Sequence, residues 1–266
     1  MPATTTLRHR MTAFVAIVCG VVGLPIGSFL NVVIHRVPAK ESVVRPRSRC
    51  PQCGTELASR DNIPVVSWLL LRGRCRTCGT SISARYPLVE LATALLFAAG
   101  GVRFSDSWAL PAYLLLFASL LAISFIDLEH YIIPNRIVYP TLFAGAVLLA
   151  AAALGEGEPV RIRNAAIGGA AAWFALLVVH FIQPKGMGFG DVRLSAVLGM
   201  YLGWIDLELV LLGMLLGFLL GAVIGLGLVM TRIRTRKDAV PFGPFLAAGA
   251  TIAILASNPI VRWYGV

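Results

Sequence analysis

The 266-residue sequence is poor in charged residues, which make up 14% of it, against about 25% in soluble domains. Acidic side chains are scarcest, with 13 Asp and Glu residues against 23 Lys and Arg residues. This composition excludes an ordinary soluble domain and predicts apolar runs of about 20 residues that cross a bilayer. Because lipid cannot satisfy exposed backbone polar groups, the expected fold is an all-α bundle.

The sequence also lacks the motifs of several common hydrolases. It contains neither the G-x-S-x-G motif of serine hydrolases nor the H-E-x-x-H motif of zinc peptidases. It has no clear internal repeat and no low-complexity tract. Hydrolysis by this chain would therefore have to use other groups.

Eight apolar segments predict a polytopic bundle of about eight transmembrane helices. The first run is too long for a cleaved signal peptide, so we expect a retained helix. We divide the chain into a first transmembrane helix (1–34), a cytoplasmic loop (35–86) and a membrane-embedded core (87–266). The second and sixth segments are short for a full span. The segments are 11–34, 87–102, 108–126, 137–154, 164–182, 194–204, 209–230 and 240–258.

The basic residues gather in the connections on one side of the predicted bundle. The net charge is +10, and 17 of the 23 Lys and Arg residues lie in the connections 35–86, 127–136, 183–193 and 231–238. By the positive-inside rule these connections face the cytoplasm, and both termini face outward. This distribution explains the charge without a nucleic-acid partner, and it favours contact with anionic lipid headgroups.

The loop contains two C-x-x-C pairs, each followed by a glycine. Four thiolates from two such pairs complete a closed tetrahedral zinc site, which leaves no open position for catalysis at the metal. Two disulfides or a redox pair are the alternatives, but disulfides rarely persist in the cytoplasm. The remaining cysteine, Cys19, lies in an apolar run and is expected in the core. The predicted zinc ligands are Cys50, Cys53, Cys75 and Cys78.

Two aspartates lie at the predicted cytoplasmic ends of apolar segments. Asp127 ends the third segment, and Asp191 follows a glycine-rich turn that contains Gly186, Gly188 and Gly190. Either aspartate alone could be a helix cap or an interfacial anchor. Together, on one side of the membrane, they favour a catalytic pair. The glycines would let an extended peptide lie close to the carboxyl groups.

A pair of close carboxyl groups can hydrolyse a peptide bond without a metal or a covalent intermediate. The two groups cannot both ionise easily, so they share one proton and titrate as a unit. The ionised member takes a proton from water, and the protonated member polarises the scissile carbonyl.

Several segments resemble the prepilin peptidases, also called type 4 leader peptidases, within the G-x-G-D intramembrane aspartyl proteases. The G-x-G-D turn at Asp191 and the earlier helix-end Asp127 are similar to this family's catalytic motifs. The paired C-x-x-C loop follows in the family's order. Three further segments resemble family motifs: 27–38, 85–91 and 241–245.

The resemblance implies the activity and its partners. Asp127 and Asp191 would cut the short basic leader of prepilins or pseudopilins after a glycine, at the cytoplasmic face of the bacterial inner membrane. Such substrates serve type IV pili or type II secretion. Many bacterial members also N-methylate the new terminus with S-adenosylmethionine. No glycine-rich strand-turn-helix motif for this cofactor is found in the sequence.

Four residues beside the aspartates are expected to contact substrate: Gly188, Gly190, Glu129 and Arg193. Arg193 stands where the family often has Lys, so its charge is kept while its hydrogen-bond geometry differs. Glu129 and His130 could orient substrate or Asp127, or they could mark the membrane interface.

Two other functions compete with the peptidase. A proton-coupled transporter could use Asp127 as its proton site, since intramembrane carboxylates also occur there. A scaffold could use the zinc loop only to recruit partners to the membrane, which would leave the paired aspartates unexplained.

Overall fold

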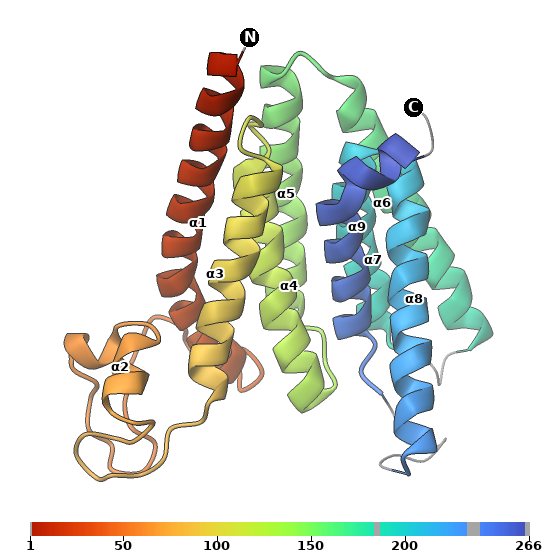
Figure 1. The fold of residues 1–266 in the computed structure, drawn as a ribbon. Coiled ribbons are helices and arrows are strands. Elements are labelled where there is room, and N and C mark those ends of the chain that lie inside the picture. Colours follow the sequence, from red (N-terminus) through yellow and green to blue (C-terminus); the bar gives the residue numbers. More distant parts are fainter. Residues whose placement is uncertain (1, 184–186, 233–239, 264–266) are drawn as a thin grey trace. The chain divides into compact units, whose positions relative to one another are not determined.

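The computed structural model describes residues 2–183, 187–232 and 240–263, and this part of the chain is all-α. It contains eight long helices and no β-strand beyond two isolated bridges, which confirms the predicted fold class (Figure 1). The elements are α1 (Pro2–Arg36), η1 (Ser59–Asn62), α2 (Val66–Leu70), α3 (Arg85–Arg103), α4 (Leu110–His130), α5 (Asn135–Gly155), α6 (Val160–Ile182), α7 (Phe189–Ile205), α8 (Leu207–Met230) and α9 (Gly243–Trp263).

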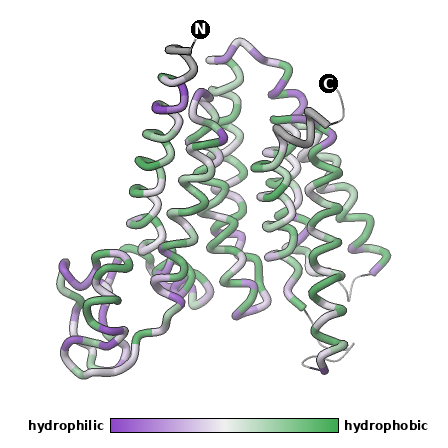
Figure 2. The backbone as a smooth tube through the Cα atoms, in the orientation of Figure 1, coloured by the Kyte–Doolittle hydropathy of each residue, from purple (hydrophilic) through white to green (hydrophobic). Residues whose placement is uncertain are grey.

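Five helices are long and apolar enough to cross a membrane: α1 from Thr6, α4, α5, α6 and α8. They fit a multi-pass membrane protein. Figure 2 shows hydrophobic residues along the helices and hydrophilic residues in the 37–84 loop and at helix ends. The two segments predicted to be short correspond to α3 and α7, which are not among the five spans.

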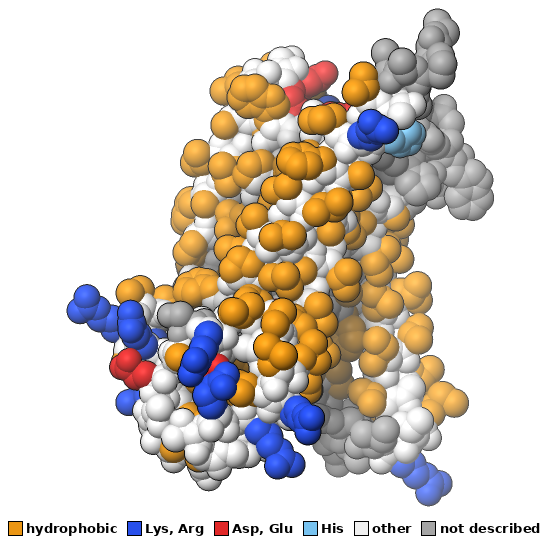
Figure 3. Space-filling model, turned by 60° about the vertical axis from the view of Figure 1, so that its left-hand side comes forward, with side chains coloured by type: hydrophobic (Ala, Val, Ile, Leu, Met, Phe, Trp, Pro, Cys, Tyr) orange, Lys and Arg blue, Asp and Glu red, His pale blue; other side chains and the backbone are white. Residues whose placement is uncertain are grey.

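The chain forms two compact units, Met1–Asp106 and Ser107–Val266. In the first unit, α1 lies along α3 with backbones close together, because small residues line the contact. A methyl group on Gly23 would lie 2.7 Å from Ala94 Cα, and one on Gly101 would lie 2.8 Å from Ala16 Cα. Figure 3 shows the loop side of the molecule, where hydrophobic side chains cover the helical part and Lys and Arg gather below it.

In the second unit, α7 packs against α5, α6, α8 and α9, and most of its residues are buried. Its contact with α6 brings Gly199 to the backbone of Gly168, where a methyl group on Gly199 would lie 2.3 Å from the carbonyl oxygen. This tight contact fixes α7, which carries Asp191.

Three glycines at four-residue spacing in α8, Gly213, Gly217 and Gly221, form a helix-packing face. A methyl group on Gly217 would lie 3.0 Å from Leu246 Cα, and one on Gly213 would lie 2.7 Å from Leu202 Cδ1. At Gly221 the same addition would meet Phe242 Cε2 at 3.0 Å. Thus α9 lies closely along α8, and its first residue, Gly243, has a defined place.

Candidate functional site: a cysteine cluster and a pair of buried aspartates

The four predicted zinc ligands come together in the first unit. Their Sγ atoms all lie within 4.8 Å of one another, and those of Cys50 and Cys78 are 3.8 Å apart. Tetrahedral Zn–S bonds of about 2.3 Å require sulfur atoms about 3.8 Å apart, so the cluster suits one zinc ion. The structure therefore brings together Cys50, Cys53, Cys75 and Cys78 in a group that could hold a metal ion.

The two cysteine pairs sit in equivalent turns. The N–H of Gly54 donates to the Cys50 carbonyl at 2.9 Å, and the N–H of Gly79 donates to the Cys75 carbonyl at 3.0 Å. Both glycines have positive φ, +70° and +71°, which a side chain would strain. The glycine after each pair, noted in the sequence, thus closes the turn that aims both sulfur atoms at one point.

Hydrogen bonds around three of the four sulfur atoms, those of Cys53, Cys75 and Cys78, favour the thiolate form, whereas the pKa of Cys50 is raised. The hydroxyl of Thr55 lowers the pKa of Cys53, and the hydroxyl of Thr80 lowers the pKa of Cys78. Backbone amides of Cys78 and Thr77 lower the pKa of Cys75. Since metal ions bind thiolates rather than thiols, these contacts suit a site that could hold a metal ion.

Asp127 lies in the last turn of α4 and is buried, with 5% of its surface exposed. The helix ends because Tyr131 adopts the left-handed conformation (φ +56°), and its N–H donates to the Asp127 carbonyl at 2.9 Å. The side-chain Oδ2 accepts a hydrogen bond of 3.0 Å from the N–H of Gly243, the first residue of α9. Asp127 is therefore held between the end of α4 and the start of α9.

Asp191 lies in the first turn of α7 and is equally buried, with 6% exposed. It exchanges hydrogen bonds with Gly188: its N–H donates to the Gly188 carbonyl, and its Oδ2 accepts from the Gly188 N–H, both at 3.1 Å. Its other oxygen, Oδ1, is buried and has no hydrogen-bond partner among the described residues. A buried acceptor of this kind is available to a substrate or to water.

The two aspartates belong to one cluster. The charge of Asp127 acts on Asp191, so their carboxyl groups are within electrostatic reach. Ile133 packs against Gly243 and Gly190, the glycines beside the two aspartates. A methyl group on Gly243 would lie 3.2 Å from Ile133 Cδ1, and a methyl group on Gly190 would lie 2.9 Å from Ile133 Cβ. The structure therefore brings the end of α4 and the starts of α7 and α9 together around two carboxyl groups.

The other predicted contact residues are placed differently. Glu129 lies two residues after Asp127, and its carboxylate is 4.0 Å from Nε2 of His130. Arg193 binds the Oδ1 of Asn135, donates to the Phe189 carbonyl at 3.3 Å and stacks over the Phe189 ring. Both residues lie near the aspartates in sequence, and the contacts of Arg193 described here are with α5 and with its own helix.

Sequence reasoning placed Gly243 only in the segment 241–245 that resembles a family motif, and it assigned no role to Ile133. The donor to Asp127 is a backbone N–H, which every residue except proline carries, so no side-chain pattern reveals it. The third glycine of the predicted turn, Gly186, lies outside the described residues.

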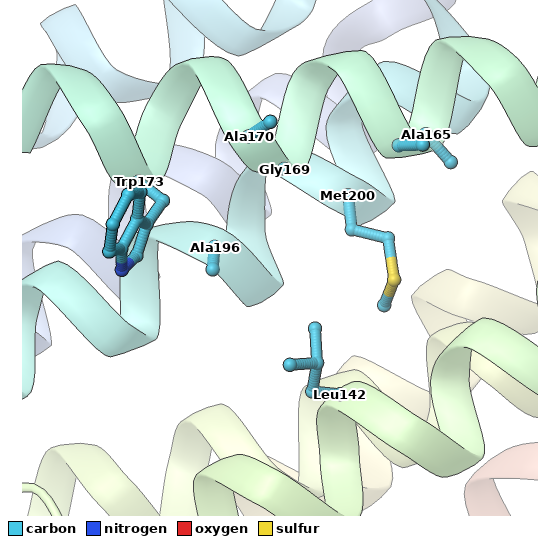
Figure 4. Close-up of a pocket in the computed structure, with 8 residues that line it drawn as sticks. Leu142, Ala165, Gly169, Ala170, Trp173, Ala196 and Met200 are labelled. Atoms are coloured by element: carbon cyan, nitrogen blue, oxygen red, sulfur yellow. The ribbon is translucent and has the colours of Figure 1, made fainter.

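A separate apolar hollow of about 370 Å³ lies between α5, α6 and α7 (Figure 4). Figure 4 shows the Met200 side chain directed toward Leu142, with Trp173 at the edge of the opening. The residues that line the hollow include no ionisable side chain, so it offers no catalytic chemistry.

Two family models match the chain in succession. Residues 21–104 match the bacterial peptidase A24 N-terminal domain, and residues 114–226 match the type IV leader peptidase family. The first match contains the cysteine cluster, and the second contains both aspartates. No solved structure gives a significant match to the chain.

Curated relatives are similar over most of the chain and carry the name prepilin leader peptidase/N-methyltransferase. A relative from Aeromonas hydrophila is 39% identical over 91% of this chain and 90% of its own length. One from Pseudomonas aeruginosa is 37% identical over 99% of this chain and 98% of its own length. One from Myxococcus xanthus is 44% identical over 72% of this chain and 57% of its own length.

Proposed function

We propose, from the premise that the chain belongs to the type IV leader peptidase family, that Asp127 and Asp191 are its catalytic pair. The chain is a membrane enzyme, a prepilin leader peptidase and N-methyltransferase. The observation that carries the proposal is the cluster itself, in which two buried carboxyl groups lie within electrostatic reach of each other at the ends of three helices.

The geometry suits water activation by two carboxyl groups. One carboxylate accepts a proton from a water molecule, whose oxygen attacks the carbonyl carbon of the scissile bond. The protonated partner donates to the carbonyl oxygen, and the leaving amine takes up a proton as the C–N bond breaks. The Gly243 N–H holds Asp127 in place, while the free Oδ1 of Asp191 can reach the substrate.

We place this site at the cytoplasmic face of the inner membrane. The support is that Asp127, Asp191 and Gly243 all lie at helix ends that border the basic connections 127–136, 183–193 and 231–238. The substrates are then prepilins or pseudopilins whose leader bond lies at this face. Glu129, Gly188, Gly190 and Arg193 lie within three residues of one of the aspartates in sequence and are proposed to contact the leader.

We assign structural zinc to the cysteine cluster, since four thiolates leave the ion no open position for water. S-adenosylmethionine is proposed as the methyl donor because the relatives are N-methyltransferases. The described residues contain no β-strand that could form a strand-turn-helix cradle for it, so we assign it no binding residues.

A proton-coupled transporter is not favoured. Its carboxylate would be expected near the middle of a membrane helix, whereas Asp127 lies in the last turn of α4 and Asp191 in the first turn of α7.

The test is cleavage of a purified prepilin by the detergent-solubilised enzyme. Asp127→Asn and Asp191→Asn should each lower leader removal by roughly 10³-fold or more, while circular dichroism and zinc content stay normal. Normal processing by either variant would refute the pair. Transfer of radiolabel from S-adenosylmethionine to the cleaved product tests the second activity, and an absence of transfer would limit the enzyme to proteolysis.

A further inference from the structure

The first unit contains a buried carboxylate that the peptidase site does not use. Glu90 lies in α3 with 7% of its surface exposed. Its Oε2 accepts a hydrogen bond of 2.7 Å from the backbone N–H of Val65, and the hydroxyl of Ser28 lies near the same carboxylate. A buried carboxylate is costly unless such donors satisfy it, so its partners define its place. Glu90 thus joins α1, α3 and the loop at one point.

A second polar group lies at the same contact between α1 and α3. The Nδ2 of Asn31 donates to the Tyr86 carbonyl at 3.1 Å and to the Gly27 carbonyl at 3.3 Å. Its Oδ1 is buried without a hydrogen-bond partner in the described part of the chain, and the residue is 3% exposed. A methyl group on Gly27 would lie 2.6 Å from Glu90 Cα, so the two helices meet backbone to backbone here.

Val65 is held in a conformation that β-branched residues rarely adopt, with φ +62° and ψ −51°. The short helix α2 follows directly, and its Trp68 donates from Nε1 to the Ile82 carbonyl at 3.1 Å. Trp68 also lies against Gly73, where a methyl group would be 2.9 Å from Cζ2. A continuous series of contacts therefore runs from Glu90 through Val65 and Trp68 to the segment just before Cys75.

We propose that Glu90 is a positioning residue that holds the cysteine-containing loop against α1 and α3, and that methyl transfer depends on this contact while leader cleavage does not. This inference rests on the proposed second activity. The catalytic pair and its hydrogen-bond donors lie in Ser107–Val266, whereas every contact of Glu90 described above lies in Met1–Asp106. The two activities should therefore respond differently to its removal.

The test compares Glu90→Ala, which removes the acceptor, with Glu90→Gln, which keeps an oxygen for the Val65 N–H. Glu56→Ala and Glu56→Gln are matched controls, because Glu56 is an exposed carboxylate in the same loop. For each full-length variant we would measure leader cleavage, radiolabel transfer from S-adenosylmethionine, zinc content and hydrogen exchange of residues 63–71.

Glu90→Ala should lower methyl transfer roughly tenfold or more and speed exchange of 63–71 by a similar factor, since the anchoring bond is lost. Leader cleavage should stay within roughly twofold, and zinc at one ion per chain. Glu90→Gln should restore most of the transfer and of the protection. The Glu56 variants should behave as wild type.

Unchanged transfer or unchanged exchange in Glu90→Ala would overturn the proposal. So would an equal loss of cleavage and transfer, which indicates general unfolding, or a parallel loss of zinc, which indicates action through the metal. A wild-type enzyme that cleaves but transfers no label would instead refute the proposed second activity, and exchange at 63–71 would still decide whether Glu90 anchors the loop.

Discussion

The backbone N–H of Gly243 donates a hydrogen bond of 3.0 Å to Oδ2 of Asp127, across a separation of 116 residues. Gly243 begins α9, and the first N–H groups of a helix have no partner within the helix. A methyl group on Gly243 would lie 2.8 Å from the same Oδ2. The closeness of the backbone to the carboxylate therefore depends on the absence of a side chain at this position.

Gly243→Ala should consequently impair cleavage. The added methyl group has to displace Asp127 or α9, and a misplacement of about 1 Å at a catalytic group can cost about 10²-fold in rate. We expect leader removal to fall roughly 10–100-fold, measured as kcat/KM on a purified prepilin.

The matched control is Gly225→Ala in α8. A methyl group there meets nothing within 4 Å, and alanine favours helix over glycine by about 1 kcal/mol. Cleavage by this variant should equal that of wild type. Equal activity of Gly243→Ala would show that the contact with Asp127 does not support catalysis.

The two glycines before Asp191 should differ in their tolerance of a side chain. A methyl group on Gly190 would lie 2.9 Å from Ile133 Cβ, whereas one on Gly188 would come no closer than 3.4 Å, to Oδ2 of Asp191. Gly190→Ala should lower kcat/KM roughly tenfold or more, and Gly188→Ala by less than about threefold. The reverse order in the same prepilin assay would contradict this packing.

The sequence reveals side chains that are scarce or regularly spaced in this chain, but it does not reveal backbone donors or apolar packing contacts, which every helix offers. Asp127 and Asp191 stand out because acidic residues are scarce, and the cysteines stand out by their spacing. The structure brings each set together. The donor from Gly243 and the packing of Ile133 depend on long-range contacts that periodicity and spacing do not encode. The helix boundaries differ from the predicted segments, by nine residues at the start of α1 and by five at the start of α7, because largely polar turns continue these helices beyond the apolar runs.

Zinc content should depend on the loop cysteines and on the glycine that follows each pair. Cys50→Ser removes one of four ligands and should abolish stoichiometric zinc, measured by native mass spectrometry. Gly54→Ala forces a side chain into positive φ, at a cost of about 1 kcal/mol, and should weaken zinc binding roughly fivefold in a chelator competition. Cys19→Ser, at a buried position in α1, should keep one zinc per chain. Full zinc in Cys50→Ser would refute the ligand set.

The contact between α6 and α7 should be sensitive to a single added carbon. A methyl group on Gly199 would lie 2.3 Å from the Gly168 carbonyl oxygen and 2.6 Å from Ala172 Cβ, so the helices would have to separate. Gly199→Ala should destabilise the protein by roughly 1–3 kcal/mol, measured as a lower midpoint of thermal unfolding in detergent. Gly227→Ala, where a methyl group meets nothing within 4 Å, provides the control. An unchanged midpoint for Gly199→Ala would show that the two helices are not packed this closely.

Arg193 connects α7 to the first residue of α5, because its guanidinium binds Oδ1 of Asn135 while its ring contact with Phe189 keeps it in place. A double-mutant cycle with Arg193→Ala and Asn135→Ala should therefore reveal a coupling of about 0.5–1.5 kcal/mol in unfolding free energy. Arg193→Lys should recover less than half of the loss, since lysine cannot donate to Asn135 and the Phe189 carbonyl with the same fixed geometry. Additive effects of the two alanine substitutions would show that the contact between Arg193 and Asn135 does not stabilise the fold.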